Sequence, residues 1–75
     1  MSAVEIRAHI TGTVWKVEAQ AGAQLEEGDP IVILESMKME IPIEAPEDGK
    51  VVEIKVTEGQ ALTEGDLVAI FFEED

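Results

Sequence analysis

The sequence predicts an all-β domain, built as a pseudo-twofold β-sandwich or flattened barrel. Three observations predict it. An internal repeat spans most of the chain, each copy contains short segments of strand-like residues, and no segment carries the long 3.6-residue period of an amphipathic helix. With 75 residues and no cysteine, residues 1–75 are expected to form one domain that depends on a small core and tight turns rather than on disulfides.

The internal repeat has a period of 37 residues and relates residues 6–34 to residues 43–71. All six glycines form pairs at this spacing: Gly12 with Gly49, Gly22 with Gly59, and Gly28 with Gly65. Seven further pairs are identical: Ile6/Ile43, Ala8/Ala45, Val14/Val51, Leu25/Leu62, Glu27/Glu64, Asp29/Asp66 and Ile33/Ile70. We interpret the chain as a duplication, so the two copies are expected to have the same fold.

Each copy is predicted to contain three strands. They are the residue ranges 4–8, 13–17 and 31–34 in the first copy, and 41–43, 50–56 and 67–72 in the second. The segments 23–27 and 60–64, each flanked by two glycines, are expected to be short and to place one leucine each, Leu25 and Leu62, in the core. Gly12 and Gly49 open strands where the backbone needs a positive φ or a close approach.

The aromatic residues are expected to pack. Trp15 has Val52 at the equivalent position, which favours packing over a ligand-stacking role. Of Phe71 and Phe72, one is expected to face the core, because successive residues of a strand point to opposite faces.

The segment 35–42 joins the two copies, and we predict a hairpin that turns near Met37 and Lys38. Helix formers dominate the segment, but β-branched residues flank it, and Pro30 and Pro42 leave a window too short for a stable helix. The turn lacks the Asn-Gly pair that two-residue turns prefer, so tertiary packing must hold it. Under the pseudo-twofold, the chain termini are expected to lie together at the opposite end.

Lys38 lies between two methionines in the hexapeptide Glu-Ser-Met-Lys-Met-Glu, residues 35–40. An exposed lysine is almost fully protonated at neutral pH and is a poor nucleophile by itself. It therefore accepts an acyl group only from an activated donor such as an acyl-adenylate.

This hexapeptide resembles the attachment site of the biotinyl/lipoyl carrier domain family, and the resemblance covers nearly the whole chain. It implies a hammerhead-type flattened barrel of two four-stranded sheets. Because both copies have the same length, the inserted thumb of some family members is absent. The resemblance implies covalent biotin on Lys38, supported by Met37 and Met39. The flanking residues are Glu35, Ser36 and Glu40. Met39 shares a strand face with Ile41 and Ile43, so packing is its favoured role.

The resemblance also implies a function. A biotin protein ligase would attach biotin, and the tethered biotin would shuttle CO₂ between the sites of a biotin carboxylase and a carboxyltransferase. The chain would be a non-catalytic carrier, either a small stand-alone attachment protein or a domain of a larger carboxylase. Met-Lys-Met is the biotin-type motif, whereas lipoyl domains more often carry Asp-Lys-Ala. A lipoyl carrier for acyl or aminomethyl transfer, with lipoate on Lys38, and an unmodified binding module remain alternatives.

Charge and composition limit the classes of partner that the chain is expected to bind. The net charge of −12 argues against nucleic acid and anionic membranes, and it favours either basic partners or simple solubility. No transmembrane or signal segment is evident, so we expect a cytoplasmic protein, monomeric as an isolated domain. His9 is the single histidine and no thiolate exists, so we expect no catalytic residues and no metal site.

Overall fold

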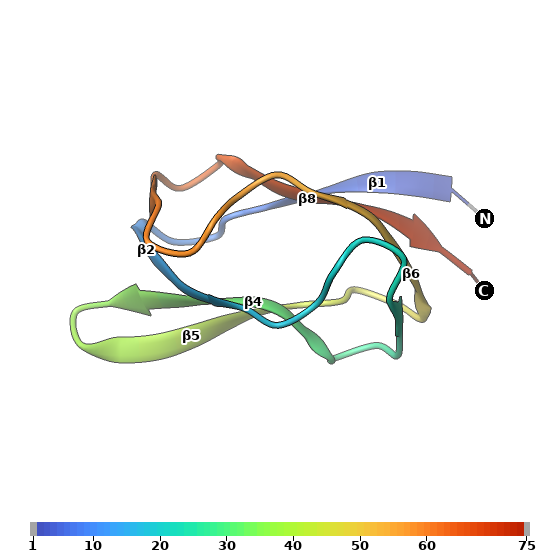
Figure 1. Cartoon of the computed structure of the whole chain (residues 1–75), viewed down its shortest axis with the longest axis horizontal. Helices are drawn as coiled ribbons and strands as arrows, with labels where there is room; N and C mark the ends of the chain where they lie inside the picture. Colours follow the sequence, from blue (N-terminus) through green and yellow to red (C-terminus); the bar gives the residue numbers. More distant parts are fainter. Residues whose placement is uncertain (1, 75) are drawn as a thin grey trace.

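The structure, a computed structural model, describes residues 2–74. Its eight strands are β1 (Ser2–Arg7), β2 (Gly12–Val17), β3 (Gln24–Leu25), β4 (Pro30–Ser36), β5 (Met39–Glu44), β6 (Gly49–Ile54), β7 (Ala61–Leu62) and β8 (Leu67–Glu73). They form an elongated body with extents of 35 × 17 × 17 Å (Figure 1). No helix of this part of the chain is long and apolar enough to cross a membrane.

Two antiparallel four-stranded sheets face each other. One has the strand order β1-β8-β6-β3 and the other β5-β4-β2-β7. A shift of 37 residues converts the first order into the second, so each sheet holds two strands from each copy. The predicted pseudo-twofold sandwich of two four-stranded sheets is confirmed, and so is the absence of a substantial helix in residues 2–74.

The structural repeat is longer than the sequence repeat. In one sheet Ser2 pairs with Glu73, and at the equivalent place in the other sheet Met39 pairs with Ser36. The repeat therefore relates residues 2–36 to residues 39–73, and only two residues lie between the copies. The interpretation of 35–42 as a linking segment was too broad, because most of it belongs to the strands.

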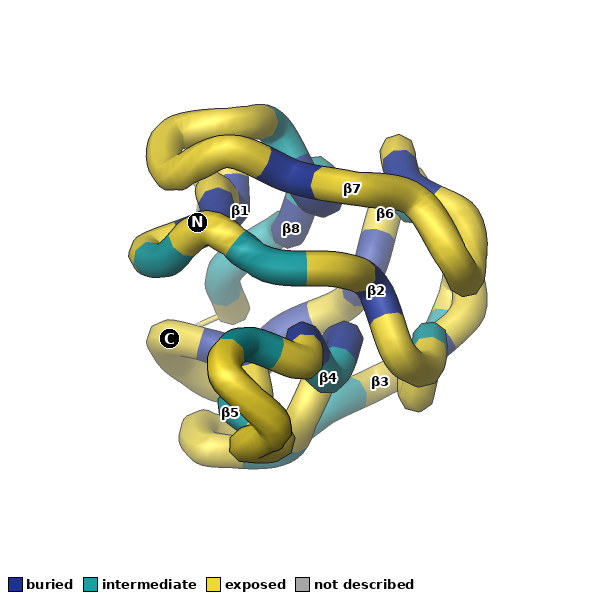
Figure 2. The backbone as a smooth tube through the Cα atoms, turned by 90° about the vertical axis from the view of Figure 1, so that its left-hand side faces the viewer, coloured by how far each residue is buried: buried dark blue, intermediate teal, exposed yellow. Residues whose placement is uncertain are grey.

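The core lies between the sheets. Figure 2, seen from the hairpin end, shows that buried residues occur in strands of both sheets. Phe71 is the largest fully buried side chain of the core, whereas Phe72 is half-buried, as predicted for one residue of the pair. Leu62 is buried, but its counterpart Leu25 is only partly so and packs against the edge of the core. The expectation of one leucine from each copy in the core was therefore right for the second copy alone.

The glycine turns of each copy hold strands of the other copy. The Gly22 N–H donates to the carbonyl of Val51 over 2.7 Å, and the equivalent Gly59 N–H donates to Val14 over 2.8 Å. Both glycines have a φ near +90°, a conformation that side-chain-bearing residues rarely adopt. The two copies are thus interlocked rather than placed side by side.

Gly12 and Gly49 are required for close approach, not for a positive φ. A Cβ at Gly12 would lie 2.7 Å from the carbonyl oxygen of Glu35. At Gly49 it would lie 2.2 Å from the carbonyl oxygen of Phe72 and 2.7 Å from the ring of Phe71. Both sites sit beside the last residues of a strand, β4 in one case and β8 in the other.

Trp15 is on the surface, which corrects the expectation that it packs. Its side chain is 49% exposed, and that of its counterpart Val52 is 50% exposed. Each residue is the extra one of a β-bulge: the register shifts between Val14 and Lys16 in one sheet, and between Val51 and Glu53 in the other. A bulge leaves its extra residue unpaired and redirects the side chains around it, which is why the exposed Trp15 and Val52 are followed by exposed Lys16 and Glu53 rather than by buried residues.

Candidate functional site

Lys38 lies in a two-residue turn at the tip of the β4–β5 hairpin. Ser36 pairs with Met39, so Met37 and Lys38 alone connect the strands. Their φ angles are 53° and 65°, both in the left-handed region. Positive φ at both central positions is the pattern of a type I′ turn, whose twist matches that of the flanking strands. The prediction of a hairpin that turns at these residues is confirmed.

The turn contains backbone strain. For residues other than glycine, the left-handed conformation costs about 1–2 kcal/mol per residue, and neither methionine nor lysine has the short polar side chain that eases it. The strands on both sides hold the turn in place, because β4 and β5 stay paired from Pro30/Glu44 out to Ser36/Met39. Leu34 in this ladder is fully buried. Packing of the hairpin base thus imposes a conformation that its tip residues disfavour.

The tip of the hairpin is exposed. Met37 is 90% exposed, Lys38 is exposed, and Met39 is 59% exposed. The expectation that Met39 packs, drawn from the strand face that it shares with Ile41 and Ile43, is wrong. Ile43 is buried, but this face leaves the core before it reaches the turn. Ser2, the residue equivalent to Met39, is exposed as well. In Figure 2 the hairpin tip is coloured as exposed.

The remaining residues of the hexapeptide form the first two pairs below the turn. Glu35 and Glu40 are exposed and directly opposite each other, whereas Ser36 is half-buried. Carboxylates placed opposite each other in a sheet repel, so this pair contributes nothing favourable to the hairpin. The structure brings all six predicted residues together at one end of the molecule.

The Lys38 amine makes no ion pair within residues 2–74. In that range three other basic residues pair with neighbouring acids: Arg7 with Glu5, Lys16 with Glu18, and Lys55 with Glu53. The absence of a pair at Lys38, despite two carboxylates nearby, leaves its amine available to an incoming reagent.

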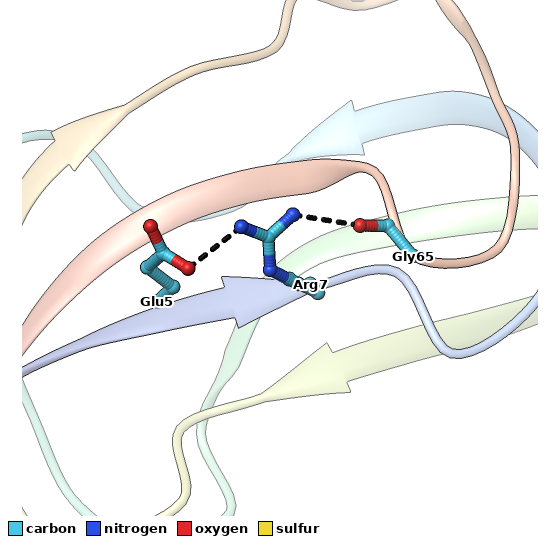
Figure 3. A network of polar contacts seen from close by, with 3 residues as sticks. All are labelled: Glu5, Arg7 and Gly65. Atoms are coloured by element: carbon cyan, nitrogen blue, oxygen red, sulfur yellow. Dashed lines mark hydrogen bonds and ion pairs between the residues drawn. The ribbon is translucent and has the colours of Figure 1, made fainter.

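Arg7 serves the scaffold. Figure 3 shows its guanidinium between two acceptors, the carboxylate of Glu5 at 2.6 Å and the carbonyl oxygen of Gly65 at 2.8 Å. The second contact ties β1 to the turn before β8. The residue equivalent to Arg7 is Glu44, which has no proton to donate to the matching carbonyl of Gly28. This bond is therefore one of the places where the two copies differ.

The hairpin has room for a covalently attached group but offers no pocket for one. One open cavity of about 710 Å³ lies between β1 and β5, and it includes Arg7, His9 and Pro42 in its lining. Two smaller ones are also lined by residues outside 35–40. Among the described residues no group of three or more His, Asp or Glu side chains is placed to hold a metal ion. A group on Lys38 would be held by its bond to the lysine and would remain mobile.

An exposed lysine on a strained turn at one end of a small scaffold is the arrangement expected of a carrier domain, which presents a covalently attached group. The biotin/lipoyl family, described as "Biotin-requiring enzyme", matches residues 2–71. The chain belongs to this family, and it is a biotin carrier domain rather than an enzyme in its own right. The implied fold and carrier class are thereby confirmed.

Two small proteins are similar over most of their length. The biotin/lipoyl attachment protein of Bacillus subtilis is 51% identical over 59 residues, which cover 79% of this chain and 81% of that protein. The biotinylated protein TB7.3 homolog of Mycobacterium leprae is 43% identical over 68 residues, 91% of this chain and 96% of that one.

Solved structures give the same fold inside much larger proteins. A single-chain, multi-domain long-chain acyl-CoA carboxylase matches with a TM-score of 0.91 and 37% identity, over 97% of this chain and 7% of that one. The urea carboxylase of Kluyveromyces lactis matches with a TM-score of 0.88 and 37% identity, over 95% and 6%. This chain thus corresponds to a small part of each carboxylase.

Proposed function

We propose that Lys38 is the residue to which biotin is covalently attached in this carrier domain. The observation that carries the proposal is the position of Lys38 at the outermost point of the hairpin, exposed and in a strained two-residue turn. Strained backbone persists where the surrounding structure enforces it and is concentrated at functional sites. Lys16, Lys50 and Lys55 lie within or beside strands and lack this presentation.

The attachment reaction needs little from the domain except access. The Lys38 Nζ, after loss of a proton, attacks the acyl carbon of a biotinyl-adenylate supplied by a biotin protein ligase. An amide forms as the nitrogen releases a second proton to solvent, and AMP leaves with the electron pair of the broken acyl–phosphate bond. The lysine becomes neutral, so the net charge of the chain goes from −12 to −13. Met37 and Met39, both exposed, provide polarizable contacts beside the new tether.

Bound biotin supplies a ring nitrogen that accepts and releases CO₂, and this domain supplies presentation. The partners we propose are a biotin carboxylase and a carboxyltransferase, in keeping with the similarity to parts of two carboxylases. A flexible tether on a rigid tip raises the effective concentration of the attached group at both active sites. The cytoplasmic location and the monomeric state stay predictions.

The experiment is intact-mass spectrometry after coexpression with biotin ligase and, separately, with lipoyl ligase. We expect the mass increase of one biotinyl group with the first enzyme. Lys38→Arg should remove it, whereas Lys50→Arg, a control at an exposed strand lysine of the same domain, should retain it. A mass increase that survives Lys38→Arg would exclude the site. An increase with lipoyl ligase alone would replace biotin by lipoate, and none with either ligase would leave an unmodified module.

A further inference from the structure

We propose that the outer face of the sheet β5-β4-β2-β7, centred on Trp15, is the docking surface for the ligase that acylates Lys38. This inference rests on the proposed function. The surface consists of Trp15, Ile33 and Pro42, and we call it the tryptophan face. The ligase is expected to present a pocket for the indole ring with basic residues around it.

The tryptophan face is close to Lys38. β2 and β4 are neighbours, and Trp15 is the extra residue beside the Leu34–Ile33 step of β4. From there β4 runs only two or three residues, roughly 10 Å, to the hairpin tip. A standard interface buries about 800 Å² on each partner, a disc of roughly 16 Å radius. An enzyme that encloses Lys38 in its active site therefore reaches Trp15 if it approaches from this side of the hairpin.

The three residues form one apolar row across three strands. Ile33 pairs with Pro42 on one side and with Lys16, next to the bulge, on the other. Because Leu34 is buried, the preceding Ile33 points away from the core, and Pro42 is exposed. Tryptophan is among the residues enriched at binding hot spots, which lie near the centre of an interface with energetically minor contacts around them.

The duplication shows that the fold does not need a tryptophan at this position. The same bulge, with nearly the same exposure, is formed on the other sheet with Val52 in place of Trp15. Toward the hairpin tip the sheets differ again: Glu35 and Glu40 occupy the positions that Phe72 and Ala3 occupy on the other sheet. Within residues 2–74, only the sheet that carries Lys38 thus has a tryptophan at its bulge and two carboxylates opposite each other beside the turn.

Charge favours a basic partner. The chain carries −12, and Lys16, the cation beside Trp15, is paired with Glu18 at 3.6 Å. A site that holds an acyl-adenylate needs cationic groups for the phosphate, and Lys38 must enter beside them. The exposed Glu35 and Glu40 would then meet a positive rim while Trp15 fills an apolar pocket.

The test is ligase kinetics on two matched variants of the full chain. Trp15→Val installs the residue that the other copy already has, and Val52→Ala truncates the equivalent position on the opposite face. For Trp15→Val we expect KM to rise about tenfold or more with kcat unchanged, as for a truncated aromatic hot spot. For Val52→Ala we expect a change within about twofold, as for a surface substitution away from an interface. Thermal unfolding checks that both variants are folded.

A second readout does not depend on turnover. Trp15 is the single tryptophan of the chain, so 5-fluorotryptophan gives one ¹⁹F resonance. We expect this resonance to shift or broaden when unlabelled ligase is added to the Lys38→Arg variant. In the swap variant Trp15→Val/Val52→Trp, with Lys38→Arg, the resonance should stay unchanged at the same ligase concentrations.

The outcomes separate this inference from the proposed function. An unchanged KM for Trp15→Val, or an unchanged ¹⁹F resonance at saturating ligase, would overturn the docking surface although wild-type Lys38 is still acylated. Equal losses in Trp15→Val and Val52→Ala would overturn it too, since they would report a general effect on the scaffold. Failure of acylation in the wild type would instead remove the proposed function.

Discussion

The two ends of the molecule have equivalent strand pairs, but a turn connects the strands at one end only. At one end β4 and β5 are joined by Met37 and Lys38, and at the other Glu73 pairs with Ser2 without a connecting turn. Figure 1 shows the hairpin and the two termini at opposite ends of the long axis, as predicted from the repeat. The ends share a ladder and a register. What distinguishes the hairpin end is the strained turn, so the scaffold is duplicated and the presented lysine is not.

The largest effect should come from the core residues beneath each end. Leu34 and Phe71 are equivalent by the 37-residue shift, and both are fully buried. Leu34→Ala should cost about 2–5 kcal/mol and Phe71→Ala about 3–5 kcal/mol in free energy of unfolding. Urea denaturation followed by circular dichroism measures both. Losses below 1 kcal/mol at either position would mean that the end concerned is not built on this core.

The next largest effect should come from the glycine at each end, Gly12 beside the hairpin and Gly49 beside the terminal strand pair. Gly49→Ala and Gly12→Ala should both destabilise by overpacking, typically by about 1–3 kcal/mol. The larger loss is expected at Gly49, where the new Cβ would meet both a carbonyl oxygen and the ring of Phe71, whereas at Gly12 it meets backbone near Glu35. Thermal denaturation of the two variants gives the order. The reverse order would show that the surroundings of Gly12, at the hairpin end, adjust less to an added Cβ than those of Gly49 at the terminal end.

A smaller effect, of opposite sign, should come from the turn. The double substitution Met37→Asn/Lys38→Gly supplies the residues that a type I′ turn prefers, and it should raise the free energy of unfolding by about 1 kcal/mol through relief of left-handed strain. Biotinylation would be lost with Lys38. Met39→Asn, in a strand position just outside the turn, is the control and should give no gain. A turn that gains nothing would mean that strain at Lys38 has no energetic cost.

The smallest effect concerns the contact that only one copy has. Arg7→Met removes the bonds to Gly65 and Glu5, which are exposed, so we expect a loss of about 0.5 kcal/mol or less that shrinks further at high salt. Glu44→Met at the equivalent position should cost nothing, because no side-chain bond to Gly28 replaces it. Chemical denaturation at low and high salt compares the two. A loss at Glu44 equal to that at Arg7 would remove this difference between the copies.

The sequence predicted the architecture and the hairpin because both depend on long-range regularity. The glycine spacing and the alternation of apolar residues located six of the eight strands to within a few residues, and the turn at Met37 and Lys38 followed from them. The two short strands β3 and β7 lie in the segments that were expected only to be short and flanked by glycines. Local propensity alone would have placed a helix there. Helix propensity gives the wrong structure for this segment because the paired strands on both sides impose the conformation of the turn.

What the sequence could not show was the direction of particular side chains. Trp15 was expected to pack because Val52 occupies the equivalent position, but equivalence says only that the two residues share one environment. That environment is an exposed bulge, of which the sequence gives no sign. The identical geometry at Val52 is visible only in the paired strands. Met39 was misplaced for a related reason: alternation assigns the face of a residue, but not whether the opposite sheet still extends far enough to cover it.

The interlocked glycine turns have a consequence for how such a domain could be rearranged. Since Gly22 holds Val51 and Gly59 holds Val14, half of this chain has no partner for its turns unless a second half is present. Two separate half-chains would hold all the turn partners of the same sandwich as a pseudo-symmetric dimer, with an open strand pair at each end. A single connection between them closes one end only. A circular permutant that joins Glu73 to Ser2 and is cut between Met37 and Lys38 would exchange the two ends and leave every strand where it is.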